Sequence, residues 1–166
     1  LYDSFRVDTN PPTLDLTGPI ASYVNDSTPS LVFNSTEDLR VTYAGSCSGD
    51  LTRAVAGDNT LVLNELSDGA YTDCELRVRD LVGNTATLSL GSFTVDTVAP
   101  ILSLTTAIAS TGNDATPSFV INVSEASNIG YSGACTSNTS AVQAGENEIT
   151  LSELSDGTYG DCAIQL

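Results

Sequence analysis

The stretch LSDGAYTDC, residues 66–74, decides the fold, because it returns almost unchanged as LSDGTYGDC at residues 154–162. A second motif, Phe5 to Thr9, returns in related form at Phe93 to Thr97. Each pair is separated by 88 residues, with no insertion or deletion between the copies. A fixed period of this kind is typical of chains built from repeated structural units. The sequence therefore predicts a tandem array of one domain.

The repeat also predicts where the units begin and end. Residues 1–10 match the end of a repeat and are expected to form the terminal strand of a preceding unit. Residues 11–97 form one complete repeat. Residues 98–166 form a second repeat that lacks its final strand, because residues 79–96 have no full counterpart after Leu166. Together with the absence of methionine, this frame indicates a piece cut from a much longer protein.

Short strands account for the complete unit. Apolar and polar residues alternate with a period of two, and clusters of Gly, Pro, Asn and Asp separate the alternating runs. The expected strands lie near residues 13–17, 30–35, 39–46, 51–55, 60–66, 70–79 and 86–95. About seven short strands with turn signals every ~8–12 residues are typical of an immunoglobulin-like sandwich. We therefore predict an all-β fold of tandem antiparallel β-sandwiches of this kind.

Each unit contains two cysteines 27 residues apart, Cys47 and Cys74 in the first and Cys135 and Cys162 in the second. The spacing alone is compatible with a disulfide, a metal pair or free thiols. A zinc site needs about four ligands, and the chain contains no histidine. Strand parity points both cysteines of a unit to the core, at the end where the two strands meet. This favours the bridges Cys47–Cys74 and Cys135–Cys162, and persistent disulfides indicate an extracellular location.

Composition excludes several classes of function. The chain has 21 acidic and five basic residues, which gives a net charge of −16. Such a polyanion repels nucleic acid and anionic membrane surfaces, and no apolar run approaches the ~18 residues of a membrane span. Because the chain has no histidine, Ser-His and Cys-His nucleophiles are excluded. We predict no enzymatic activity, no catalytic residue, no nucleic-acid partner and no membrane insertion.

Four motifs occur in order along the chain, Asn25–Ser30, Leu66–Tyr71, Asp80–Asn84 and Phe93–Pro100. This series resembles the bacterial Ig-like repeats of giant Gram-negative surface adhesins, in a branch that bears a cysteine pair. The resemblance implies secretion, a stalk or adhesive role at the cell surface, and calcium at the junctions between domains.

Strand direction places Asp26, Asp68 and Asp96 at the end of unit one that leads into unit two. Glu125 and Glu146 are expected at the facing end of unit two. Calcium takes about six to eight oxygen ligands, so these five residues are the candidate ligands of a junction calcium ion, and no other cofactor is expected. The alternative is that Asp26 and Asp68 cap turns through hydrogen bonds to the backbone.

Two other features have structural explanations. Tyr71 and Tyr159 follow Asp-Gly where one strand turns into the next, as in a tyrosine corner, whose hydroxyl bonds to the backbone. Asp80 and Asn84 are expected to form the turn before the last strand of unit one.

The leading functional hypothesis is mechanical. Sandwiches joined by short Pro-containing linkers form a stalk in which each unit contacts only its neighbouring repeats. The rival hypothesis is an adhesion module that binds a glycan or a protein. The most divergent part of the two units, residues 46–55 against 134–143, is where such binding would be sought.

The last strand of unit two raises a separate question. The segment Tyr2 to Asp8 has the sequence of a last strand. It fits strand donation to the second unit of a neighbouring molecule, which predicts head-to-tail self-association into a filament. The favoured interpretation is that each last strand is supplied in cis by the continuous polypeptide, because Phe93 to Asp96 already provides the last strand of unit one in this way.

Overall fold

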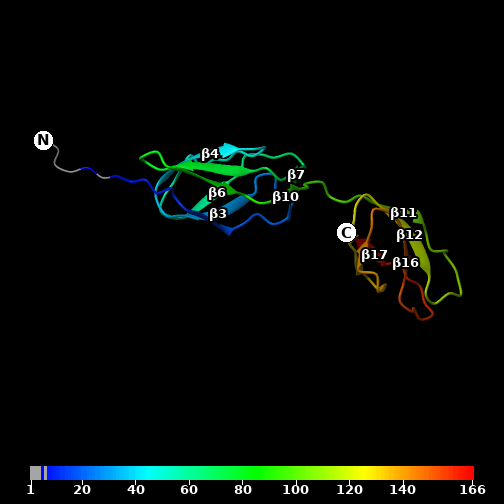
Figure 1. Cartoon of the computed structure of the whole chain (residues 1–166). Coiled ribbons are helices and arrows are strands. Elements are labelled where there is room, and N and C mark those ends of the chain that lie inside the picture. Colours follow the sequence, from blue (N-terminus) through cyan, green and yellow to red (C-terminus); the bar gives the residue numbers. More distant parts are fainter. Residues whose placement is uncertain (1–4, 6) are drawn as a thin grey trace. The chain divides into compact units, whose positions relative to one another are not determined.

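A computed structural model describes residue 5 and residues 7–166, which form two compact units, one up to Val98 and one from Ala99 (Figure 1). Residues 1–4 and 6 of the expected N-terminal strand lie outside the described residues. Phe5 and Val7 belong to no strand, and their side chains are 84% and 72% exposed. Every regular element of the described residues is a β-strand. Accordingly, the described residues contain no helix that is long and apolar enough to cross a membrane.

One sheet of unit one contains β1 (Leu14–Gly18), β3 (Ser30–Ser35) and β6 (Gly57–Val62), in the order β1-β3-β6. Both pairings are antiparallel. Alternation explains β3, the strand in the middle. Leu31, Phe33 and Ser35 are buried, whereas Val32 and Asn34 are half-buried. The sheet therefore contributes one apolar face to the core.

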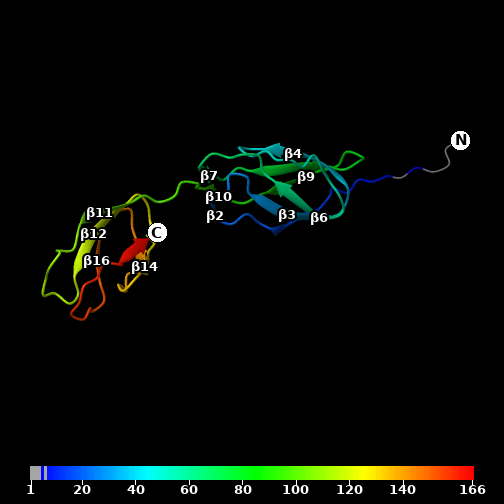
Figure 2. The ribbon, with the colours of Figure 1, turned by 180° about the vertical axis from the view of Figure 1, so that it is seen from behind.

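The facing sheet has four strands in the order β5-β4-β8-β9. They are β4 (Leu39–Ala44), β5 (Arg53–Ala54), β8 (Glu75–Arg79) and β9 (Thr85–Ser89), and all neighbours are antiparallel. In β8, Leu76 and Val78 turn inward and Arg77 and Arg79 turn outward. Figure 2, the view from behind, shows β4 and β9 along the upper part of unit one and β3 and β6 along the lower part.

A small third sheet lies at one end of unit one. It contains β2 (Tyr23–Val24), β10 (Phe93–Val95) and β7 (Gly69–Tyr71), with β2 parallel and β7 antiparallel to β10. The expected single strands at 70–79 and 86–95 are therefore wrong in detail. The first is divided into β7 and β8, and the second into β9 and β10, because the chain moves from one sheet to another within each segment.

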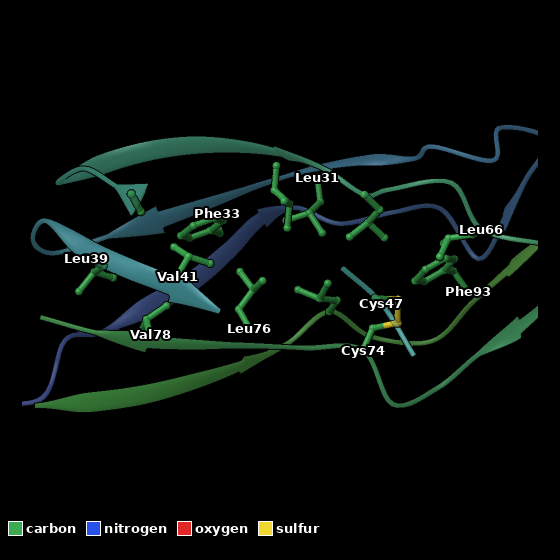
Figure 3. Packing of buried hydrophobic residues seen from close by; sticks show 14 of the residues in the cluster. Leu31, Phe33, Leu39, Val41, Cys47, Leu66, Cys74, Leu76, Val78 and Phe93 are labelled. Carbon is green, nitrogen blue, oxygen red and sulfur yellow. A yellow bond between two sulfur atoms is a disulfide. The ribbon is translucent and has the colours of Figure 1, made fainter. Parts of the chain in front are cut away.

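The two larger sheets enclose a core of fifteen buried residues in unit one (Figure 3). Phe33, Leu61 and Leu76 have no exposed surface, and the Cys47–Cys74 bridge belongs to the same cluster. Burying a side chain of this size stabilises the fold by ~1.5–3 kcal/mol. The all-β sandwich predicted from the sequence is thus confirmed, and its core holds the disulfide.

Unit two repeats this layout with fewer strands. β11 (Leu102–Thr106), β12 (Ser118–Val123) and β16 (Gly145–Thr150) form the sheet that corresponds to β1, β3 and β6, and each begins 88 residues after its counterpart. The remaining strands form two pairs. β13 (Ser127–Asn128) pairs with β15 (Ala141–Val142), and β14 (Gly130–Ser132) pairs with β17 (Ala163–Gln165). The core of unit two is smaller, with Ile121 and Ile149 at its centre.

Candidate functional site

A disulfide joins the same two places in each unit. Cys47 is bonded to Cys74 and Cys135 to Cys162, with Cα atoms 5.2 Å apart in both cases. These are the pairings that strand parity predicted. In unit one both cysteines are buried, at 5% and 1% exposure. In unit two Cys135 is buried but Cys162 is exposed.

A glycine beside each bridge lets two backbone segments meet. Gly45 has φ of 79°, and a Cβ at this position would collide with the carbonyl oxygen of Asp73. The Asp73 carboxylate accepts hydrogen bonds from Ser46 N at 3.2 Å and Ser46 Oγ at 3.1 Å. Gly133 and Asp161 make the same approach in unit two. The role of these glycines was not predicted from the sequence, although their recurrence at the repeat distance was a usable signal.

The two predicted tyrosine corners are confirmed. Tyr71 Oη donates to the Ser67 carbonyl oxygen at 2.9 Å, and Tyr159 Oη donates to that of Ser155 at 2.8 Å. In unit one the Tyr71 ring also stacks on Phe93, with ring centroids 5.4 Å apart. The hydroxyls fix the approach to the disulfide-bearing strand, so both tyrosines have a structural role.

Three of the five candidate calcium ligands lie near one end of unit one. The N–H of Asp96 bonds to the Val24 carbonyl oxygen, which brings the end of β10 beside the loop that holds Asp26. Asp68 Oδ1 accepts hydrogen bonds from Thr97 N at 3.0 Å and Thr97 Oγ1 at 2.9 Å. A depression lined by Ser27, Glu65, Leu66, Ser67, Asp68 and Thr97 lies at this end. The order of the loops along the chain was thus a sufficient guide to their shared position.

These carboxylates serve as backbone acceptors. Asp26 Oδ1 accepts from Thr28 N at 2.8 Å, and Asp96 Oδ1 accepts from Val98 N at 3.2 Å. In unit two Glu146 is exposed on β16, and the Glu125 carbonyl oxygen accepts the Ser127 hydroxyl. In the part of the chain that the structure describes, no three Asp, Glu or Cys side chains are grouped so that they could hold one metal ion. Calcium at these residues stays a prediction.

The most densely bonded carboxylate is Asp80, at the turn between β8 and β9. It is 3% exposed, and its Oδ1 accepts the backbone N–H groups of Val82, Gly83 and Asn84. Burial raises the pKa of the Asp80 carboxyl. The hydrogen bonds from the Asn84 side chain and from these three backbone groups outweigh burial, so the pKa lies below its ordinary value. The turn predicted for Asp80 and Asn84 is confirmed.

Comparison with known proteins gives one family. The family described as Bacterial Ig-like domain matches residues 15–97, which is half of the chain and covers nearly all of unit one. No curated protein matches the sequence. No solved structure matches it either.

Proposed function

The chain belongs to the bacterial Ig-like domain family, and we propose that it is a non-enzymatic segment of the stalk of a large bacterial surface protein or adhesin. A domain of this family is a surface or structural module. The two disulfides favour an oxidising location, since cytoplasmic thiols are kept reduced. An extracellular stalk combines the family, the disulfides and the acidic, soluble surface in one role.

The observation that carries this proposal is the recurrence of the bridge in both units. Each disulfide closes the segment between the end of one core strand and the start of another, Cys47 to Cys74 and Cys135 to Cys162. A unit that is pulled from its termini cannot release this segment without breaking a covalent bond. Such a crosslink also stabilises a small domain against thermal unfolding. Both effects suit a module that acts by keeping its shape.

Single-molecule force spectroscopy of the full chain tests the mechanical role. Two unfolding events are expected under oxidising conditions. Reduction should lengthen each event by about 90 Å, the extended length of the segment that the bridge closes. The matched control is the variant with Cys47→Ser and Cys74→Ser, which should lengthen the event of unit one alone. A chain that extends without any resolved unfolding event would contradict the proposal.

Location is tested separately. Antibodies raised against the folded chain should label intact cells of the source bacterium. Labelling that appears only after lysis would contradict a place at the cell surface.

A further inference from the structure

The basic residues of this acidic chain gather on one sheet of unit one. The chain has five basic residues, all arginine, and four of them, Arg40, Arg53, Arg77 and Arg79, belong to β4, β5 and β8. Arg40 lies directly opposite Arg53 on one neighbouring strand and opposite Arg79 on the other. Residues opposite each other in an antiparallel pair share a face, as do residues two apart on one strand. We call these four residues the arginine face.

The arginine face is exposed and mostly unneutralised. All four side chains are at exposed positions. Arg77 Nε lies 3.4 Å from Glu75 Oε2, whereas within the described residues Arg40, Arg53 and Arg79 have no ion pair and no side-chain hydrogen bond. Directly opposite side chains have Cβ atoms about 5 Å apart, and like-charged side chains in such a pair are destabilising. An anion held between these guanidinium groups would remove the repulsion and satisfy their N–H donors.

The rest of this sheet surface defines the chemistry of a partner. The other exposed positions on β4 and β9 are hydroxyl side chains, Thr42, Thr85, Thr87 and Ser89. No strand of this four-stranded sheet has an exposed apolar or aromatic residue. Protein interfaces have an apolar or aromatic centre, and single-stranded nucleic acid is bound by aromatic stacking within a positive groove. A polar surface with guanidinium and hydroxyl groups instead fits a sugar chain that carries carboxylates.

Unit two shows that the fold does not require this surface. The residues 88 positions after Arg40, Arg53 and Arg77 are Asn128, Ala141 and Gln165, which are all uncharged. Unit two nevertheless keeps the three-stranded sheet, the disulfide and the tyrosine corner of unit one. The arginine face is therefore a property of unit one, added to a framework that both units share.

We propose that the arginine face of unit one binds an acidic glycan, a polysaccharide whose carboxylate groups accept hydrogen bonds from neighbouring guanidinium groups. Arg40 is central, since it lies between Arg53 and Arg79. A guanidinium presents paired N–H donors that match the two oxygens of a carboxylate. Thr85 and Thr87 supply hydroxyls for the sugar ring, whereas the Thr42 hydroxyl donates to the Arg77 carbonyl oxygen at 2.9 Å and can only accept a further hydrogen bond. This activity goes beyond the stalk role and would attach the stalk laterally to a polysaccharide layer.

Isothermal titration of the full chain with oligogalacturonate at about 0.15 M ionic strength, where the Debye length is about 8 Å, tests the proposal, with neutral dextran oligomers as the reference. Arg40→Gln should weaken oligogalacturonate binding roughly tenfold, as expected for the loss of a charge-assisted hydrogen bond. The matched control is Thr60→Glu, which makes the same change of net charge at an exposed position of β6, on the other sheet. It should alter the affinity less than about twofold, because exposed charges beyond a Debye length are screened.

Three results would overturn the proposal. The first is no binding of oligogalacturonate, or equal binding of dextran. The second is an equal loss of affinity in Arg40→Gln and Thr60→Glu, which would reflect net charge alone. The third is concentration-dependent self-association in sedimentation that Arg40→Gln abolishes, without glycan binding. That result would identify a second copy of this chain as the partner.

Discussion

The side-chain amide of Asn84 connects two segments of unit one: its Nδ2 lies 2.7 Å from Asp80 Oδ2 and 3.2 Å from the carbonyl oxygen of Asp8. Asp80 also holds three backbone N–H groups of the same turn. The turn between β8 and β9 is therefore ordered by one buried carboxylate, and through Asn84 it is bonded to the segment that enters the unit.

This carboxylate makes the stability of unit one sensitive to acid. The pKa of Asp80 is lowered in the folded state, so its ionised form stabilises folding in full above the ordinary value of 3.8. That contribution is lost as the pH falls from this value through the lowered folded pKa. We expect Asp80→Ala to lower the urea midpoint of unit one at neutral pH. The difference from the unaltered chain should shrink across the acidic range.

Urea titrations from neutral to strongly acidic pH provide the measurement. Asp15→Ala is the matched control, since Asp15 is an exposed carboxylate on β1 that caps no turn. A constant difference between Asp80→Ala and the unaltered chain at every pH would show that ionisation of Asp80 is not what orders the turn.

The disulfides should account for a large part of the stability of each unit. Replacing Cys47 and Cys74 by serine is expected to lower the free energy of unfolding of unit one by about 3.5 kcal/mol, the chain-entropy value for a loop of this length. Urea denaturation measures the loss, and the corresponding double variant at Cys135 and Cys162 should affect unit two alone. Non-reducing peptide mapping should find the same two bridges. Free thiols or a bridge between the units would refute this prediction.

The strand expected at residues 30–35 shows what alternation can predict. Its range is that of β3, because Leu31 and Phe33 face a single core throughout. The change of sheet between β7 and β8 was not predictable in the same way. Tyr71 and Cys74 both face the core although they are three residues apart, and such a step also fits a bulge in one strand. β2 has two residues, too few for any period.

Of the candidate functional residues, the cysteine pairs were predictable from the sequence and the arginine face was not. Cysteine pairing followed from parity because both cysteines lie beside core strands. The arginine face was not predicted, because Arg40, Arg53 and Arg79 are far apart in sequence and only the strand register aligns them. The bonding of Asp68 to Thr97 likewise depends on how the end of β10 meets the loop before β7.

Asp68 distinguishes turn capping from calcium binding. Asp68→Ala removes the acceptor of Thr97 N and Thr97 Oγ1 and should cost unit one about 1 kcal/mol. If Asp68 acts only as a turn cap, Asp68→Ala should lower the stability of unit one equally in calcium and in chelator. Thermal unfolding under both conditions makes the comparison, again with Asp15→Ala as control. A loss confined to calcium would instead favour a ligand set that includes Asp26, Asp68, Asp96, Glu125 and Glu146.

The arginine face predicts that removal of one positive charge stabilises unit one. The chain has a net charge of −16, so general electrostatics expects the removal of any positive charge to destabilise it. Local repulsion predicts the opposite for Arg40, which lies between Arg53 and Arg79. We expect Arg40→Gln to raise the free energy of unfolding of unit one by about 0.5 kcal/mol at low ionic strength. The gain should shrink as added salt screens the repulsion.

Arg77→Gln is the decisive control. Arg77 lies opposite Thr42 and Thr87 and is paired with Glu75 at 3.4 Å, so its loss removes an attraction and no directly opposed positive charge. Urea denaturation at low and high salt should show no gain for Arg77→Gln, or a small loss. If both variants lose stability, net charge governs the stability of the sheet, and Arg40, Arg53 and Arg79 do not repel one another. If Arg40→Gln alone gains stability, the arginine face contains a repulsion that a bound carboxylate would relieve.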